Sequence, residues 1–335
     1  MPSITSDKDL PKLLDTPTKQ VKWAKKLIAK HLNSTSKRIG GFDKPPIQGM
    51  FSRTFFVALT DGCEVVVQFR TEPLDVKAFK IAKGALGSFV PDAGALQDEE
   101  LESAGAWAYF MPRMPGQIWA YGIAGKGAEG RIAINKSLGR VFSKGFLADN
   151  SHEAVETKLR PHLDAILASP LEDILPYRAT LESFAKRLDE LAQLPLWVAH
   201  YDINEVNVLV NEECEVTALV DWELSTPLPF GAGFGRIHTI AGEYNEGEFW
   251  MPDEFEVAER GFWTELFNGM PEHIRTVLEK HIDLVQDAVI LATLLNCFHF
   301  EEGEVGVGEV SLRALPKFMT YQIPFVRGQE QPYTS

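Results

Sequence analysis

The part of this 335-residue chain that most constrains its fold lies near the middle, where two short aliphatic runs follow a polar loop. The runs cover residues 206–210 and 216–220, and a mostly polar stretch, Asn211-Glu212-Glu213-Cys214-Glu215, separates them. Short β-branched runs joined by such a stretch are typical of a β-hairpin. Pairing of the two runs brings Asn207, in the first run, close to Asp221, which follows the second. The sequence therefore predicts two paired strands with a polar side chain at the mouth of each.

Three side chains of this segment have the chemistry that a magnesium-assisted phosphoryl transfer requires. Asn207 and Asp221 offer an amide oxygen and a carboxylate, which suit Mg²⁺, an ion that usually keeps waters and takes one or two protein carboxylates. Asp202, on the loop five residues before Asn207, can face an incoming hydroxyl group and accept its proton. Taken singly, the alternative is that Asp202 and Asn207 cap a turn and that Asp221 ends a strand. The combination in this register favours the functional interpretation.

The same residues carry a resemblance to a known family. The motif His200-x-Asp202-x-x-x-x-Asn207, followed by Val220-Asp221-Trp222-Glu223, resembles the catalytic and metal-binding motifs of the aminoglycoside phosphotransferase and choline kinase-like group, especially its fungal members. That group shares the protein-kinase fold. The resemblance therefore implies a two-lobed α+β fold, with a small N-terminal antiparallel-sheet lobe and a larger, mainly helical C-terminal lobe. It covers the chain from about Ile47 to Phe300, although only these two motifs are specific.

The resemblance also implies a division of the chain. Residues 1–111 are expected to form the N-terminal lobe, which begins with a helical segment over residues 1–42 that ends in a Ser-, Lys- and Gly-rich stretch. Residues 112–116 are expected to connect the lobes. Residues 117–335 are expected to form the helical C-terminal lobe, with the catalytic loop and the acceptor site. The length agrees with two lobes, because 335 residues exceed what one hydrophobic core usually supports.

In the N-terminal lobe the resemblance implies a site for ATP. Residues 48–59 are predicted as a turn and a strand and residues 64–70 as a second strand, with the hairpin signal Asp61-Gly62 between them. They correspond to the family's nucleotide-covering hairpin and the strand after it. Ser52 is then expected in the covering loop. Arg70 is expected on the phosphates, with Gln68 two residues earlier on the same strand face.

The end of the lobe completes the expected nucleotide site. Residues 107–111 are predicted as another strand, which leads into Pro112-Arg113-Met114-Pro115-Gly116, the family's connector between lobes. The backbone of Met111 and Arg113 is therefore expected near adenine.

The chain departs from the family pattern at three places. Arg70 stands where the family commonly has Lys, and although Arg can grip phosphate bidentately the two are not interchangeable. The following helix, predicted over residues 74–86, should carry a Glu that pairs with this cation, yet its only acid is Asp75, with Glu72 just before it. The partner is Asp75, Glu72 or absent. Tyr201 occupies a position where the family usually has Gly.

Together the motifs predict an ATP- and Mg²⁺-dependent phosphotransferase that moves the γ-phosphate to a hydroxyl group of a small molecule. Asp202 is expected as the general base, Asn207 and Asp221 as the magnesium ligands, and Asn204 as a hydrogen-bond donor to the transferred phosphoryl group. The departures keep two alternatives open. One is a catalytically weak or inactive kinase-fold protein that binds nucleotide or a partner, and the other is a kinase fold turned to another reaction on a specialised metabolite.

The acceptor is the part of the function that the sequence constrains least. Acidic residues crowd two segments, Glu243, Glu246, Glu248, Asp253, Glu254 and Glu256 in one and Glu301, Glu302 and Glu304 in the other. Such carboxylates can receive an amine-bearing acceptor, and Trp119, Phe249 and Trp250 can offer aromatic surface to a cation. The alternative for a run of charges is a solvated face.

Composition excludes several other classes of function. A net charge of -14 would repel phosphate backbones, so nucleic-acid binding is not expected. Cys63, Cys214 and Cys297 lie far apart, which argues against a disulfide framework or a zinc site. No signal-peptide core and no apolar run long enough for a transmembrane segment are found, so the cytoplasm is the expected location. The sequence makes no prediction of the oligomeric state.

Overall fold

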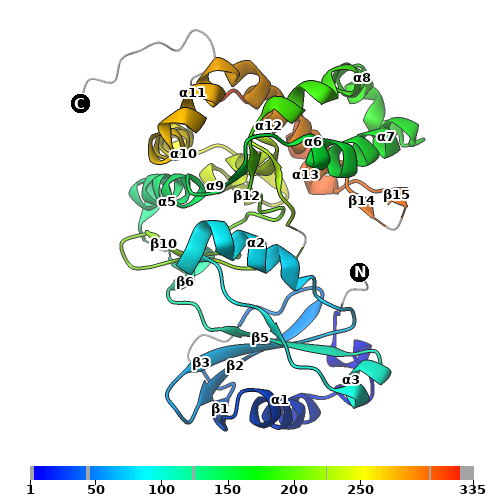
Figure 1. The fold of residues 1–335 in the computed structure, drawn as a ribbon, viewed down its shortest axis with the longest axis vertical. Helices are drawn as coiled ribbons and strands as arrows, with labels where there is room; N and C mark the ends of the chain where they lie inside the picture. Colours follow the sequence, from blue (N-terminus) through cyan, green and yellow to red (C-terminus); the bar gives the residue numbers. More distant parts are fainter. Residues whose placement is uncertain (1–3, 43–45, 123–124, 224, 302, 325–335) are drawn as a thin grey trace. The chain divides into compact units, whose positions relative to one another are not determined.

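The computed structural model of the chain describes residues 4–42, 46–122, 125–223, 225–301 and 303–324 (Figure 1). The chain divides into two compact units. The first comprises residues 1–83 and 90–114, and the second comprises residues 84–89 and 115–335. A short segment from within the first stretch, residues 84–89, thus belongs to the second unit.

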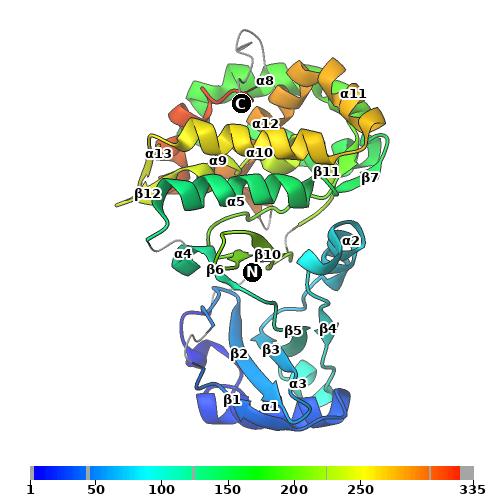
Figure 2. The same cartoon turned by 90° about the vertical axis from the view of Figure 1, so that its left-hand side faces the viewer.

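The first unit is built on a five-stranded antiparallel sheet with the strand order β1-β2-β3-β5-β4 (Figure 2). Its strands are β1 (Ser36–Ile39), β2 (Ser52–Leu59), β3 (Glu64–Arg70), β4 (Gly94–Ala95) and β5 (Trp107–Pro112). The helices of this part of the chain are η1 (Asp7–Asp9), α1 (Pro17–His31), α2 (Val76–Leu86), η2 (Gly87–Phe89) and α3 (Glu99–Ser103). The predicted strands over residues 64–70 and 107–111 are confirmed, and the strand expected within residues 48–59 begins at Ser52.

Helix α1 covers one face of this sheet. It begins at Pro17, after Thr16, whose Oγ1 accepts the Lys19 backbone N–H, as N-cap Thr and N1 Pro usually do. Its buried apolar residues share a core with the odd-numbered residues of β3, namely Val65, Val67 and Phe69. Because side chains alternate across a strand, the even-numbered residues of β3 face the other way.

The second unit is mainly helical. Its α-helices are α4 (Trp119–Gly122), α5 (Gly127–Phe142), α6 (His152–Ala154), α7 (Arg160–Ala168), α8 (Arg178–Arg187), α9 (His238–Ala241), α10 (Phe255–Gly269), α11 (Glu272–Lys280), α12 (Ile282–Cys297) and α13 (Glu309–Phe318). A π-helical turn, η3 (Val155–Leu159), and three 3-10 segments, η4 (Glu172–Tyr177), η5 (Leu188–Gln193) and η6 (Ala232–Phe234), complete the set. Helices α5 and α10 lie side by side (Figures 1 and 2). Their close approach needs Gly139, since a Cβ there would meet the α10 backbone at Leu266, 3.0 Å away.

Short strands complete the second unit. They are β6 (Gln117–Ile118), β7 (Phe146–Ala148), β8 (Leu196–Trp197), β9 (Val208–Val210), β10 (Val216–Leu219), β11 (Leu228–Pro229), β12 (Glu243–Asn245), β13 (Glu248–Trp250), β14 (Phe300–Glu301) and β15 (Glu304–Val305). They form the sheets β10-β9-β6 and β11-β8-β7 and the hairpins β12-β13 and β14-β15. The predicted hairpin is confirmed, because Val216 pairs with Val210 and Leu219 with Val208.

The sheet-based first unit and the helical second unit confirm the predicted α+β fold class. Buried aromatic rings fill the core of the second unit, where Phe230 lies edge-on to Trp197 at 4.9 Å and to Phe234 at 5.4 Å between ring centroids. Among the helices of the described residues, none has the length and apolarity needed to cross a membrane.

Candidate active site

The loop between β8 and β9 carries the predicted catalytic residues, and His200 anchors its start. The His200 side chain is buried and lies against the Trp222 ring, with 4.6 Å between centroids. Burial lowers the pKa of His200 to about 4, so the ring is neutral at physiological pH. Its Nε2–H can therefore donate to the Val220 carbonyl oxygen, 2.8 Å away. His200 thus joins the loop to the end of β10 and has a structural role here.

Asp202 lies at the centre of a group of hydrogen bonds. Asn207 Nδ2 donates both to the Asp202 backbone oxygen (2.8 Å) and to Asp202 Oδ2 (3.2 Å). Asn204 Nδ2 also donates to the Asp202 backbone oxygen, at 3.2 Å, and its Oδ1 accepts the backbone N–H groups of Val206 and Asn207. The structure therefore brings Asp202, Asn204 and Asn207 together. Part of the hydrogen-bonding capacity of Asn204 goes to shaping the loop.

The candidate metal ligands lie at adjacent strand ends. The backbone carbonyl of Asn207 accepts the Val220 N–H at 3.0 Å, and Asp221 follows Val220 directly. Asp221 has φ +66°, a left-handed conformation that Asp and Asn tolerate better than most residues. The short pairing of β9 with β10 therefore delivers Asn207 and Asp221 to the same end of the hairpin.

The donor atoms fit a magnesium ion. Because Asn207 Nδ2 is directed at Asp202, the orientation of the amide is fixed, and its Oδ1 could serve as an oxygen ligand together with the carboxylate of Asp221 at the same end of the hairpin. Hard oxygen donors of this kind suit Mg²⁺, which takes its remaining ligands from waters and substrate phosphates. Within the described residues no group of three or more His, Cys, Asp or Glu side chains could hold a metal by itself. One carboxylate and one amide oxygen do not fill the coordination shell of Mg²⁺, so waters and the phosphates of a bound nucleotide would supply the other ligands.

A cation that the sequence reasoning missed also contacts Asp202. Arg236 Nη1 lies 2.7 Å from Asp202 Oδ1, and the two side chains are 34% and 40% exposed. Arg236 stands between η6 and α9, after the Gly-rich stretch 231–235 that superficially suggests a dinucleotide loop. Arg236 lies 34 residues beyond Asp202 and belongs to no motif. The sequence therefore contains no pattern that predicts its contact with Asp202.

In the first unit, the predicted nucleotide residues gather on one face of the sheet. Ser52 pairs with Arg70 across β2 and β3, so the two side chains share a face. Gln68 lies on this face too, and its Nε2 donates to Thr54 Oγ1 at 3.3 Å, which in turn lies 3.3 Å from Ser52 Oγ. This face is opposite to the one that α1 covers.

Met111 and Arg113 extend the same face onto and beyond β5. Met111 pairs with Val66 of β3 and is nearly buried. The Arg113 backbone N–H donates to the Glu64 carbonyl oxygen at 3.0 Å. Its guanidinium pairs with Glu64 Oε2 at 2.7 Å and stacks on the Phe56 ring at 4.3 Å. The side chain and the backbone N–H of Arg113 thus bind residues of the sheet. The backbone carbonyl of Arg113 is the polar group that could contact adenine.

Two of the departures from the family pattern have a structural explanation. Asp75 Oδ1 accepts the Lys77 backbone N–H at 2.9 Å, so it caps the start of α2. Tyr201 does not adopt a positive φ, and its backbone N–H donates to Ser225 Oγ at 3.3 Å. A side chain at position 201 therefore imposes no backbone strain.

Much of the first acidic segment is ion-paired. The buried Arg131 contacts Glu254 Oε1 at 2.9 Å and also pairs with Glu243, and Arg313 lies 3.9 Å from Glu248. Of the second segment, Glu302 lies outside the described residues. The pairing with Arg131 and Arg313 leaves fewer free carboxylates for an amine than the sequence suggested.

The expected aromatic surface is also smaller. Trp119 and Phe249 are 3% and 2% exposed, so the expectation that they offer a face to a cation is wrong. The reason is packing, as Phe249 lies against Phe318 with 4.6 Å between centroids. Trp250, on β13, is 53% exposed and remains available.

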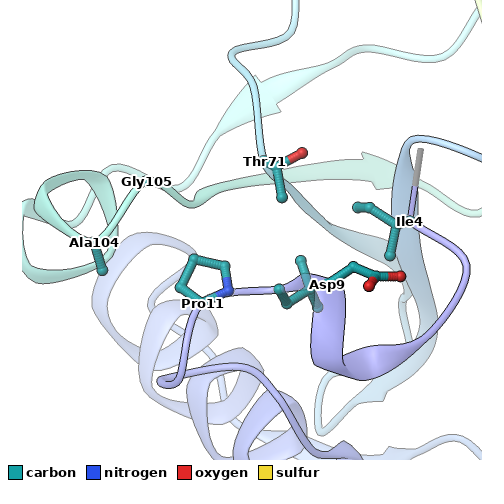
Figure 3. Close-up of a pocket in the computed structure, with 7 residues that line it drawn as sticks. Ile4, Asp9, Pro11, Thr71, Ala104 and Gly105 are labelled. Carbon is teal, nitrogen blue, oxygen red and sulfur yellow. The ribbon is translucent and has the colours of Figure 1, made fainter. Parts of the chain in front are cut away.

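The N-terminal segment lines two hollows in the first unit, and one of them, of about 520 Å³, is drawn in Figure 3. Its walls are Ile4, Asp9, Leu10, Pro11, Thr71, Ala104 and Gly105. The other, of about 570 Å³, lies between residues 4–7 and residues 48–50, with Arg53 at its wall. None of the predicted site residues lines either hollow.

Comparisons with known proteins identify the family of the chain. The model of the phosphotransferase enzyme family matches residues 45–253, more than half of the chain. No curated protein sequence matches the chain.

Solved structures share the fold at low sequence identity. Amicoumacin kinase hAmiN, in complex with AMP-PNP, Ca²⁺ and Ami, is 10% identical, with a TM-score of 0.54 over 90% of this chain and 94% of that one. A protein of Ralstonia eutropha described as an aminoglycoside phosphotransferase is 15% identical, with a TM-score of 0.51 over 89% and 96%. Aminoglycoside phosphotransferase APH(4)-Ia is 11% identical, with a TM-score of 0.51 over 83% and 98%. Since the family model matches more than half of the chain, and solved phosphotransferases share its fold, the chain belongs to the phosphotransferase enzyme family.

Proposed function

We propose that this protein transfers the γ-phosphate of ATP, with Mg²⁺, to a hydroxyl group of a small molecule. The observation that carries the proposal is the hydrogen-bonded group around Asp202. Asn207 Nδ2 donates hydrogen bonds to Asp202. The Asn207 backbone oxygen accepts a hydrogen bond from the N–H of Val220, the residue before Asp221. A proton acceptor and two oxygen ligands thus lie within one short loop and hairpin.

In this proposal each residue has a defined task. Asp202 accepts or steers the proton of the acceptor hydroxyl group, and Asn204 donates a hydrogen bond to the transferred group. Asn207 and Asp221 hold the magnesium ion, which when bound neutralises charge on the phosphates. Such general-base assistance is typically worth ~10² to 10⁴ in rate.

The nucleotide would lie on the polar face of the first unit's sheet. Arg70 would contact its phosphates, with Ser52 and Gln68 beside it, and the backbone of Met111 and Arg113 would lie near adenine. The shared face of Ser52, Gln68 and Arg70 supports this assignment, as does the AMP-PNP in the kinase of similar fold. We also propose the lobes 1–111 and 117–335 with a connector over 112–116. The change of unit after Met114 supports that division.

The test is a panel of hydroxyl- and amine-bearing small molecules, incubated with ATP and Mg²⁺ and scored by a mass gain of one phosphate. Asp202→Ala and Asp221→Ala are each expected to reduce transfer by at least ~10²-fold. Asp287→Ala is the matched control, because Asp287 also pairs with an arginine, Arg187, at 2.8 Å, yet lies outside the motifs. Full transfer by the Asp202 variant would refute the proposal. Stabilisation by ATP without release of ADP across the panel would favour a nucleotide-binding protein instead.

A further inference from the structure

We infer that Arg236 is a positioning residue for Asp202, holding the carboxylate in the orientation that receives the acceptor hydroxyl group. The inference rests on the proposed function and extends it to a residue outside the motifs. Its basis is the contact of Arg236 Nη1 with Asp202 Oδ1 at 2.7 Å.

The two carboxylate oxygens of Asp202 are held from different directions. Arg236 donates to Oδ1, and Asn207 Nδ2 donates to Oδ2 at 3.2 Å. An Asp side chain rotates freely about its terminal torsion when it is not held. An ionised carboxylate has about four lone-pair positions, so two donors fix its plane and still leave positions for a hydroxyl group. Removing Arg236 would leave Oδ1 without its fixed donor and free the carboxylate to turn.

The backbone that carries Arg236 is itself fixed on α12. Thr293 Oγ1, on that helix, donates to the Gly235 carbonyl oxygen at 3.0 Å, and Thr293 is buried. A Cβ on Gly235 would lie 2.6 Å from the backbone carbon of Ala292, so only glycine permits this approach. Thr239 Oγ1 then donates to the Arg236 carbonyl oxygen at 2.7 Å. The backbone of Arg236 is therefore held in place by α12 and Thr239, as a positioning residue requires.

Three titratable groups near Arg236 are neutral at physiological pH. The neighbouring histidines, His200 and His238, have their pKa values lowered by burial and, secondarily, by Arg236 itself, so both are neutral near pH 7. Burial raises the pKa of Tyr244, which keeps that group neutral as well. The carboxylate of Asp202 pairs with the Arg236 guanidinium at 2.7 Å.

The experiment compares Arg236→Met and Arg236→Lys with Arg187→Met. Arg187 pairs with Asp287 at 2.8 Å and is 43% exposed, so its substitution removes a similar ion pair away from the motifs. The readouts are kcat and KM for MgATP, measured as ADP release with water as the acceptor, and the shift in melting temperature that MgATP causes. A misplaced reacting group can cost ~10²-fold in rate.

We expect Arg236→Met to lower kcat by about 10- to 100-fold, with KM for MgATP and the MgATP-induced melting shift unchanged. Arg236→Lys should recover part of kcat, because it restores a donor to Asp202, and Arg187→Met should behave as the wild type. A crystal structure of Arg236→Met should show the Asp202 carboxylate turned away from its present plane.

If Arg236→Met folds, two results would overturn the inference. One is an Arg236→Met protein with wild-type kcat while Asp202→Ala is inactive, which would leave the proposed function standing. The other is a loss of the MgATP-induced shift in both Arg236 variants, which would assign Arg236 a structural role. If Arg236→Met does not fold, the test relies on Arg236→Lys alone. A lower kcat of Arg236→Lys, with the Asp202 carboxylate in its present orientation in the crystal structure of that variant, would then refute the positioning role. Wild-type turnover in Asp202→Ala would refute the proposed function itself.

Discussion

Glu259 is an acidic residue on helix α10 whose side chain is buried. Its Oε2 accepts the Tyr321 hydroxyl at 2.7 Å, and Trp263 Nε1 donates to the same hydroxyl group. Burial raises the pKa of Glu259 to about 7, because the charged form loses its hydration. The carboxyl group is therefore protonated in acid and becomes a buried charge as the pH rises.

This raised pKa predicts a pH-dependent stability that a single substitution removes. The contribution of Glu259 to the free energy of unfolding is fully present below its ordinary pKa of 4.5 and is lost as the pH rises through about 7. The loss amounts to roughly 3 kcal/mol at most. Glu259→Gln keeps the shape of the protonated form, so it should match the wild type at pH 5 and exceed its melting temperature at pH 8.

Melting scans from pH 5 to 8 test this prediction. Glu256→Gln is the matched control, because Glu256 lies on the same helix but is exposed. Parallel pH curves for the wild type and Glu259→Gln would contradict the raised pKa.

Among the residues of the site, those in one local motif could be predicted and those from distant segments could not. Asp202, Asn204 and Asn207 belong to one loop, and the hairpin register adds Asp221. Arg236 reaches Asp202 only because Gly235 packs on α12, a tertiary contact that leaves no periodic pattern in the sequence.

At the scale of elements, the spacing of apolar residues predicted the strands and helices that bury an apolar face. Alternating or β-branched runs predicted β3, β5 and the β9-β10 hairpin. Apolar residues also recur at helical spacing from Ile274 to Ala292, and they lie in two helices, α11 and α12, which meet at His281. Strand β1 was missed because Ser36–Ile39 has one apolar residue and is an edge strand, exposed along much of its length. Apolar residues recur at helical spacing over residues 181–192, yet the α-helix α8 ends at Arg187 and the chain continues as the 3-10 segment η5, where an i, i+3 spacing fits either geometry.

The N-terminal segment is an element whose role could not be predicted, and the contacts of Arg53 define it. Arg53 Nη1 donates to the Ile4 carbonyl oxygen at 3.0 Å, and Arg53 Nε lies 3.3 Å from Asp7 Oδ1. The Ile4 N–H donates to the Met50 carbonyl oxygen at 2.5 Å. Residues 4–7 are thus fastened to the turn before β2, which is the proposed nucleotide-covering loop.

Arg53→Met should therefore raise KM for MgATP several-fold and leave kcat nearly unchanged, because the covering loop loses its support while the catalytic loop is untouched. Loss of the buried Arg53 contacts should also lower stability by about 1–3 kcal/mol. Steady-state kinetics measure the first effect and urea unfolding the second. Arg38→Met, on the exposed edge strand β1, is the control. An unchanged KM would argue against the role of this segment.

At the scale of the whole molecule, two buried histidines predict how stability responds to acid. Burial lowers the pKa of His200 to about 4 and that of His238 to about 3. Their contribution to stability is present above the ordinary value of 6.5 and is lost as the pH falls through these folded values. Between pH 4.5 and 6.5 the opposite trend of Glu259 offsets part of this loss. The steepest decline should therefore lie below about pH 4.5.

Replacing His238 tests the contribution of one group. His238→Asn should reduce the acid slope of the unfolding free energy by about 1.4 kcal/mol per pH unit, which corresponds to one proton. Urea unfolding followed by tryptophan fluorescence from pH 3.5 to 6 measures that slope, with the exposed His152→Asn as the control. An identical slope in both variants would refute the assignment.

The assignment of residues 84–89 to the second unit has a consequence for any attempt to dissect the protein. The backbone passes between the units three times, after Lys83, after Phe89 and after Met114. A fragment starting at residue 115 would lack Phe89, over whose ring the Lys144 ammonium lies at 4.9 Å. Proteolytic cleavage after Met114 would therefore leave the two fragments in contact through η2, and they would not separate as independent products.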